Sequence, residues 1–187
     1  MILKDISEVF SGHTFRERIE NNPEGDCYVI QLKDLDMQNQ KIKEQPHLVQ
    51  SKGIYEKHFI QPGDILFVAK GSNNYAITFY EGYKAVAASV FFIIRIKDEK
   101  VNPFYLTWYI NQPPAQEYIH KGKEGTMVTN ISKVTLENLP IEIPTLETQV
   151  KIAKLHELMR KEFFLSEEIL KKKKLFIEKE LLTTIKS

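Results

Sequence analysis

The side chains of this 187-residue sequence that could perform catalysis lie far apart. The five histidines share no metal-ligand spacing, such as two histidines four residues apart around a glutamate. The one cysteine, Cys27, lies in an apolar stretch, where thiols are usually buried and unreactive. Neither of the glycine-rich loops that hold nucleotide phosphates is present. We therefore predict no metal, no cofactor and no catalytic activity.

Two segments come near the motif of amino-methyltransferases, in which an Asn or Asp precedes Pro-Pro and an aromatic residue. The segment at 111–115, Asn-Gln-Pro-Pro-Ala, has an inserted glutamine and lacks the aromatic residue. The segment at 102–105, Asn-Pro-Phe-Tyr, lacks the second proline. Because Asn before a helix and Pro at its first position are typical start signals, we interpret both segments as helix boundaries.

Two polar loops carry the side chains that DNA recognition uses. Arg or Lys contacts guanine or phosphate, Asn or Gln contacts adenine, and glycine permits close approach. The first loop supplies Lys70, Ser72, Asn73, Asn74 and Tyr75, and the second supplies Lys121, Lys123 and Thr126 as candidate DNA contacts. An ordinary surface turn explains each loop equally well.

The charge distribution argues against a strongly basic DNA-binding surface. Residues 1–150 hold 16 Lys and Arg against 19 Asp and Glu, net −3, whereas residues 151–187 hold 10 against 6, net +4. A third basic cluster, at residues 13–18, is diluted by Glu17 and Glu20, and we rank it last. Any DNA affinity must therefore come from a local patch or from assembly with other chains.

The elements that must position these loops are short strands and helices. Strands are predicted at 27–32 and 87–96, and a hairpin is predicted from 65–69 and 75–80 with the first polar loop at its tip. Asn102-Pro103 opens a buried helix that ends near Asn111, Pro113-Pro114 interrupts it, and a short helix resumes at 115–120. We expect an α+β globular domain with a mixed or antiparallel sheet over residues 1–145.

Residues 146–187 contain no glycine or proline and predict one long helix of the coiled-coil type. Apolar residues at spacings of 7, 4 and 7 form a seam that we expect to bind a partner helix: Leu158, Leu165, Ile169 and Phe176. Four consecutive lysines, 171–174, cross the seam, so a solvated helix end is the alternative. A helix of this length cannot bury the seam against its own domain, which predicts a homodimer.

Several short motifs in this order resemble the target recognition domain of type I restriction-modification specificity subunits. The opening segment at 3–14, Gly63-Asp64 with the strand that follows, and Ala88-Ser89 carry part of the resemblance. The most specific part runs from Gly125-Thr126 through Ile131-Ser132 to the segments at 139–141 and 143–152, which looks like the family's junction between recognition domain and spacer helix.

The resemblance implies a non-catalytic, sequence-specific DNA-binding subunit that recognises one half-site of double-stranded DNA per chain. It implies partners as well, namely methyltransferase and restriction (translocase) subunits that dock through the helix. The usual subunit has two recognition domains and two spacer helices, whereas this sequence has one of each. The resemblance does not transfer base-contacting residues, because these domains diverge where they read sequence.

Two other interpretations stay open. The chain could be a coiled-coil interaction protein, or a degenerate solitary fragment of a specificity subunit, that does not bind DNA. The single cysteine and the absence of a signal peptide or an apolar run of membrane-spanning length predict a cytoplasmic protein without a membrane segment.

Overall fold

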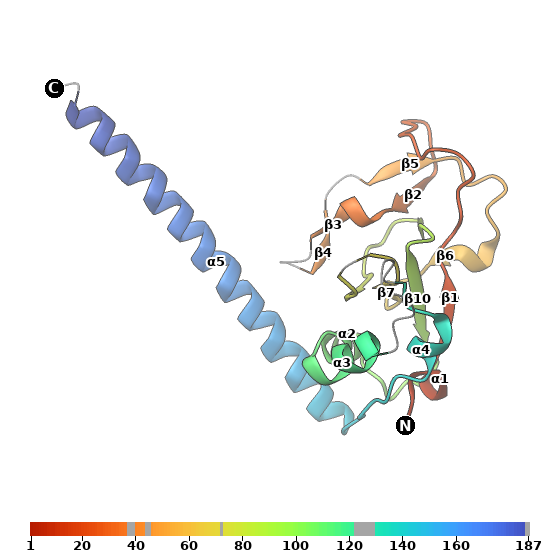
Figure 1. The fold of residues 1–187 in the computed structure, drawn as a ribbon. Helices are drawn as coiled ribbons and strands as arrows, with labels where there is room; N and C mark the ends of the chain where they lie inside the picture. The colour runs from red at the N-terminus through yellow and green to blue at the C-terminus, as the bar shows by residue number, and fades with distance from the viewer. Residues whose placement is uncertain (37–39, 44–45, 72, 122–129, 186–187) are drawn as a thin grey trace.

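The computed structural model describes residues 1–36, 40–43, 46–71, 73–121 and 130–185. A domain of short strands and helices precedes one long helix, α5 (Leu146–Ile185), which projects away from it (Figure 1). The strands form antiparallel and mixed sheets. These features confirm the predicted α+β fold with a long C-terminal helix.

The first sheet is antiparallel and has the order β1 (Ser7–Ser11), β10 (Phe91–Ile96), β7 (Ile65–Val68), β8 (Ala76–Thr78). Strands β7 and β8 pair antiparallel, with Leu66 opposite Ile77, which confirms the predicted hairpin. Strand β7 is buried on both faces, so Ile65 and Phe67 face one apolar cluster while Leu66 and Val68 face another. The hairpin that carries the first polar loop therefore starts from the centre of the core.

The second sheet has the order β5 (His47–Val49), β2 (Cys27–Ile30), β9 (Ala85–Ala87), β6 (Phe59–Ile60), and β2 pairs parallel to β9. A separate ribbon joins β3 (Leu35–Asp36) to β4 (Lys41–Ile42). The predicted strand at 27–32 ends at Ile30, and a 3-10 turn at Leu32–Asp34 follows; a second such turn spans Glu56–His58.

The prediction of one continuous strand at 87–96 is wrong. A turn at Ala88-Ser89-Val90 separates β9 from β10, and the two strands belong to different sheets. The segment that follows β1 fixes this turn, because the Gly12 N–H donates to the Phe91 carbonyl at 3.0 Å and the His13 N–H donates to the Ala87 carbonyl at 2.7 Å. The two sheets are thus joined where the opening motif meets Ala88-Ser89.

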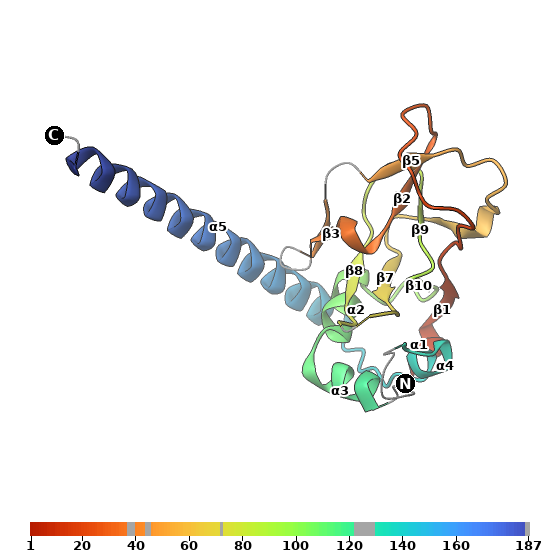
Figure 2. The ribbon, with the colours of Figure 1, turned by 45° about the horizontal axis from the view of Figure 1, so that its top comes forward.

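Four short helices cover one face of the first sheet: α1 (Leu3–Ile6), α2 (Pro103–Ile110), α3 (Pro113–Lys121) and α4 (Lys133–Glu137). Figure 2 shows them together at the end of the domain opposite β2, β5 and β9. The Asn102 side chain accepts from the Phe104 and Tyr105 N–H groups, as the sequence predicted for a helix start. Pro113-Pro114 does not interrupt a helix but forms the first turn of α3, where their missing N–H groups cost nothing.

Two main apolar clusters make the core. One lies between the helices and the first sheet and includes Leu3, Phe67 and Leu106; the other lies between the two sheets and includes Phe79, Phe91 and Ile93. The first sheet is therefore the middle layer of the domain. This layering leaves the loops at the ends of the strands at the surface, where recognition residues belong.

An ion pair fixes the start of the β7–β8 hairpin. Asp64 is 3% exposed, and both its carboxylate oxygens accept from Arg95 on β10, at 2.9 and 2.6 Å. Arg95 also donates to the Phe59 carbonyl at 3.0 Å, and Gly63 has a φ of 95°, which favours glycine. The Gly63-Asp64 motif therefore holds the start of β7 next to β10.

Candidate nucleic-acid interface

The structure pairs the start of the first polar loop with the segment at Asn130-Ile131. Lys70, after β7, forms an antiparallel bridge with Asn130, and the Ile131 N–H donates to the Ala69 carbonyl at 2.9 Å. Lys121 of the second polar loop ends α3, directly after His120. Ser72, Lys123 and Thr126 lie outside the described residues, and nothing further is derived for them.

A cleft of ≈ 450 Å³ opens beside these loops, and we name it the amide cleft. Its lining consists mainly of amide and ring side chains: Gln40, Asn73, Asn74, Tyr75, Asn111, Gln116 and His120. Amides are the side chains that bind adenine edges in DNA grooves. Three of the predicted DNA contacts, at 73–75, are therefore placed together, whereas Gln40, Gln116 and His120 join them from distant segments that sequence reasoning did not connect.

Only some of these amides are available to a ligand. Asn111 holds β8, accepting from the Ala76 N–H at 2.8 Å and donating to the Ala76 carbonyl at 2.9 Å. Asn74 is 3% exposed and donates to the Val68 carbonyl at 2.9 Å, so its amide stabilises the hairpin tip. Asn73, in contrast, is exposed. In this conformation Asn73, and not Asn74, presents an amide to the surface.

Lys70 and Lys121 are both exposed, and Tyr75 is half-buried against the core cluster between the sheets. Burial, with a smaller contribution from the charge of Asp36, raises the pKa of Tyr75 to about 12. Tyr75 is therefore neutral near pH 7 and supplies a ring and a hydroxyl, while the two lysines supply positive charge. Lysine, amide and tyrosine groups at one edge form a surface that can contact both phosphates and base edges.

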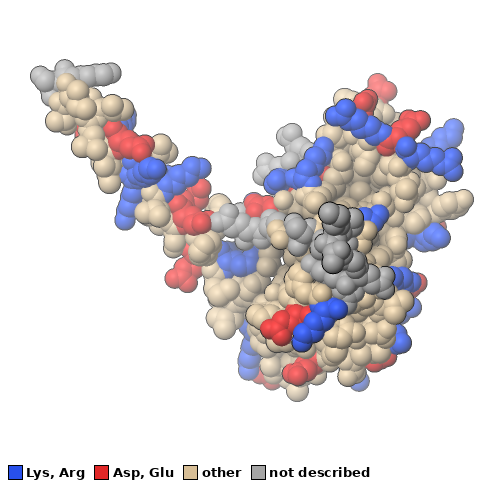
Figure 3. Space-filling view, viewed as in Figure 1, with Lys and Arg blue, Asp and Glu red and all other residues tan. Residues whose placement is uncertain are grey.

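The charges on the visible face of the molecule do not form a single basic field. Figure 3 shows lysine and arginine atoms mixed with acidic atoms along α5 and around the domain. Exposed lysines on α5 pair with neighbouring glutamates, such as Lys151 with Glu147. Pairing of this kind cancels charge locally. Any electrostatic attraction to DNA must therefore come from small clusters of lysine and arginine side chains that form no ion pair.

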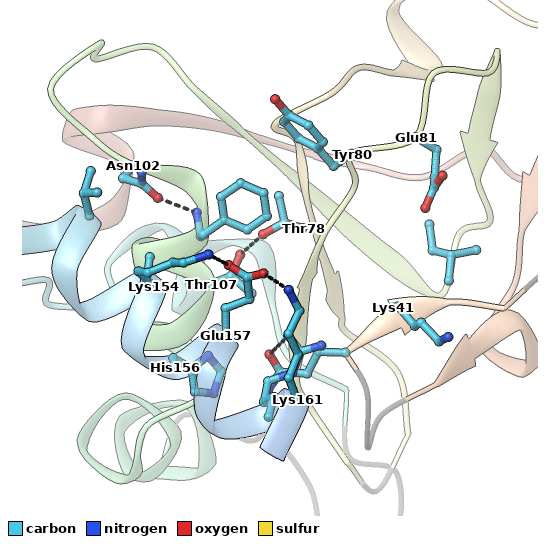
Figure 4. Close-up of a pocket in the computed structure, with 16 residues that line it drawn as sticks. Lys41, Thr78, Tyr80, Glu81, Asn102, Thr107, Lys154, His156, Glu157 and Lys161 are labelled. Carbon is cyan, nitrogen blue, oxygen red and sulfur yellow. Dashed lines mark hydrogen bonds and ion pairs between the residues drawn. The ribbon is translucent and has the colours of Figure 1, made fainter. Parts of the chain in front are cut away.

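A cleft of ≈ 560 Å³ separates α5 from the domain, and Figure 4 shows the charged side chains on its helix wall. The Glu157 carboxylate accepts from both Lys161 and Lys154, and these hydrogen bonds lower its pKa to about 2. Glu157 is therefore ionised at neutral pH and is unsuited to act there as an acid or base. Across the cleft, the exposed rings of Tyr80 and Phe104 lie 5.5 Å apart, centroid to centroid.

The predicted seam of α5 is exposed along its whole length. Leu158, Leu165, Ile169 and Phe176 are 50–64% exposed. An α-helix turns about 100° per residue, which places the seam on the opposite side of α5 from Gln149, the buried residue that faces the domain. The seam thus points away from its own domain, and its exposed apolar side chains are free for a partner.

Gln149 fixes the direction of α5. Its side chain is fully buried, donates to the Lys100 and Pro144 carbonyls, and accepts from the Asn102 N–H, each at 2.9 Å. One amide therefore ties the first turn of α5 to the segment that begins α2. The motif at 143–152 contains this residue, and its role could not be predicted because two of its three partners, Lys100 and Asn102, are almost 50 residues away.

Replacing Gln149 with leucine is expected to lower the free energy of unfolding by about 2–4 kcal/mol, since three buried backbone groups lose their partners. Urea unfolding followed by circular dichroism measures the change. Glu147→Gln, which removes an exposed ion pair two residues earlier, is the control and should change stability by less than about 1 kcal/mol. Equal effects of the two variants would contradict this role of Gln149.

Two further properties of the described residues bear on function. No group of three or more His, Cys, Asp or Glu side chains within them is arranged to hold a metal ion. No helix within those same ranges combines the length and the apolar composition needed to cross a membrane.

Comparison with solved structures finds similar folds. The chain resembles the S subunit of the type I restriction-modification system from M. genitalium (16% identity, TM-score 0.54, 83% of this chain and 37% of that one). It also resembles the HsdS subunit from Thermoanaerobacter tengcongensis (18% identity, TM-score 0.56, 87% and 39%). A chain from a study of complex assembly and conformational transition in the type I R-M system matches with 17% identity and a TM-score of 0.64, over 86% of this chain and 37% of that one.

The chain therefore spans less than two fifths of the length of each of these structures. A search of curated proteins finds no match. The model of one family, the type I restriction modification DNA specificity domain, matches residues 1–177. Its members are non-catalytic DNA-specificity components, and this chain belongs to that family.

Proposed function

We propose that this chain recognises one half-site of a double-stranded DNA target and that two copies, paired through the seam of α5, read a bipartite sequence. The observation that supports the proposal is the amide cleft, which Asn73, Asn74 and Tyr75 of the first polar loop line together with His120, the residue before Lys121. An exposed amide, a tyrosine and nearby lysines thus gather on the surface of a DNA specificity domain.

The loop residues divide into two roles. Asn73 is the proposed base-contacting side chain, because it is exposed and its amide can pair with an adenine edge. Lys70 and Lys121 are proposed phosphate contacts, since they are exposed cations close in sequence to Asn73 and His120, which line the amide cleft. Asn74 supports the hairpin tip from inside and positions its neighbours.

We further propose that α5 docks the methyltransferase and restriction subunits of a type I system. The helix extends far beyond the domain (Figure 1), and exposed apolar side chains outside the seam, such as Phe163 and Leu170, form a second stripe along it. A helix with two apolar stripes can bind a second copy and another subunit at the same time. Partner subunits should also strengthen the weak DNA binding expected of the chain alone.

Asn73→Ala is expected to change which base is preferred at one position of the target, with a loss of roughly 1–3 kcal/mol of discrimination between bases. Lys70→Ala should instead weaken binding to all DNA sequences about equally. Selection on a random duplex library, with the chain bound to its partner subunits, measures both effects. Gln50→Ala, an exposed amide outside the amide cleft, is the control. An unchanged motif for Asn73→Ala would remove this loop from the reading surface.

A further inference from the structure

A second polar cleft, of ≈ 440 Å³, lies where the opening motif meets the turn at Ala88-Ser89. The side chains that could bind a ligand there are His13, Glu17, Arg18, Gln31, Lys33 and His47. They come from the segment after β1, the turn after β2, and β5. We name it the basic cleft. The opening segment at 3–14 and Ala88-Ser89 both reach this cleft, whereas neither of these motifs lines the amide cleft.

The walls of the basic cleft are fixed by hydrogen bonds from three segments. The Ala88 N–H donates to the Ile30 carbonyl at 2.9 Å, and the Gln31 N–H donates to the Asp34 carboxylate at 2.8 Å. Lys43 ties the far side by donating from its ammonium group to the Lys33 carbonyl at 2.8 Å. The cleft is therefore a built feature of the fold rather than a gap between independent loops.

A hydrogen bond joins two of the lining side chains, Lys33 and His47. Lys33 Nζ lies 3.0 Å from His47 Nε2, and an ammonium group can only donate, so Nε2 accepts. The other ring nitrogen of His47, Nδ1, is buried and has no hydrogen-bond partner.

Gln31 adds a buried donor, because its Nε2 amide group also has no hydrogen-bond partner. A buried amide donor without an acceptor is unfavourable, so a group that brings oxygen acceptors would be favoured here. Arg18 and Lys33 are both exposed and form no ion pair with any carboxylate in the part of the chain that the structure describes. The cleft therefore combines two exposed cations and a buried amide donor without a partner with one acidic side chain, Glu17.

We propose that the basic cleft binds a phosphate group of the DNA backbone, with Arg18 and Lys33 as its charged contacts. A phosphate supplies several acceptor oxygens and a negative charge, which are the two properties that the cleft lacks. This inference rests on the proposed function. The β3–β4 ribbon links the two clefts along the chain, since Lys33 precedes β3 and Gln40, which precedes β4, lines the amide cleft.

The test compares DNA binding by the full chain and by the variant Arg18→Gln with Lys33→Gln, using fluorescence anisotropy with a duplex of random sequence at several salt concentrations. The double variant is expected to bind roughly tenfold more weakly and to reduce the slope of log affinity against log salt by about 1. Lys33→Arg keeps the charge and should keep both the affinity and the slope. Lys100→Gln, an exposed lysine outside both clefts, is the matched control and should leave them unchanged.

Three outcomes would overturn this inference or separate it from the proposed function. If the wild-type chain binds duplexes but the double variant binds with the same affinity and slope, the basic cleft is not a DNA contact. If inorganic phosphate raises the unfolding temperature of the wild type but not of the double variant, while DNA binding is unchanged, the cleft takes a free anion and the assignment to DNA is wrong. If the wild type binds no duplex even with its partner subunits, the proposed function itself fails.

Discussion

A variant with Leu165→Asp and Ile169→Asp is expected to be a folded monomer at concentrations where the unmodified chain is a dimer. Each of these side chains is more than half exposed on the seam of α5 that faces away from the domain. Burial of a Leu or Ile side chain in a dimer contributes about 1.5–3 kcal/mol, and a carboxylate in its place must also be desolvated. We therefore expect the dissociation constant to rise by at least about a thousandfold.

Light scattering coupled to size-exclusion chromatography measures the mass, and circular dichroism verifies that the variant is helical. Leu170→Asp is the matched control, because Leu170 is 69% exposed but lies about 120° around the helix from the seam. The control should remain a dimer. A monomeric wild type at tens of micromolar would contradict self-pairing and favour a fragment of a longer specificity subunit.

The geometry of pairing has a consequence for the DNA target. An antiparallel pair separates the two runs of four lysines and places the domains at opposite ends, whereas a parallel pair would bring like charges together. Two identical domains related by a two-fold axis must read the same bases in opposite directions. The expected target is therefore two inverted half-sites with an unread spacer, and the double aspartate variant should lose that bipartite preference.

Gly12→Ala is expected to destabilise the domain by about 3 kcal/mol or more, at the upper end of the costs known for overpacked sites. A Cβ atom at Gly12 would lie 2.2 Å from the Ala88 carbonyl oxygen and 2.6 Å from the Ala87 carbonyl oxygen. These are backbone atoms of the turn that separates the two sheets, so they cannot move without breaking the bonds from Gly12 and His13.

Thermal and urea unfolding of the variant measure this cost. Gly82→Ala is the control, since a Cβ there would meet no atom within 4 Å. We expect the control to have nearly wild-type stability. A Gly12→Ala chain as stable as that control would show that the junction of the sheets tolerates a shift of the β9–β10 turn.

The parts of the fold that depend on local sequence could be predicted, and the parts that depend on distant contacts could not. The long helix, the Asn102 cap and the β7–β8 hairpin follow from short-range patterns. The break at Ala88-Ser89 carries no glycine or proline, and its cause is the approach of Gly12, more than 70 residues earlier. The apolar pattern alone therefore predicted one strand where the structure has two, β9 and β10.

The same limit applies to the candidate site. Residue types identified the polar loop at 70–75, but they could not separate the exposed Asn73 from the buried Asn74, whose amide bonds to Val68. The glutamates near the cluster at 13–18 in the sequence make it the weakest of the three candidates, whereas in the structure Arg18 lines the same cleft as Lys33 and His47, and only Glu17 of the two glutamates lines that cleft. Charge counts along the chain do not describe charge around a cleft.

The anchoring of α5 at one end makes it a lever. Beyond Lys161 the helix runs for another 24 residues to Ile185, which is roughly 36 Å at 1.5 Å per residue. A tilt of only about 5° at the base would move the far end by about 3 Å, close to the rise of one base pair in DNA. In a paired assembly the second domain would sit at that far end. The three hydrogen bonds of the Gln149 side chain would then limit the tilt of α5. They would thereby determine by how many base pairs the spacer between the two half-sites can vary.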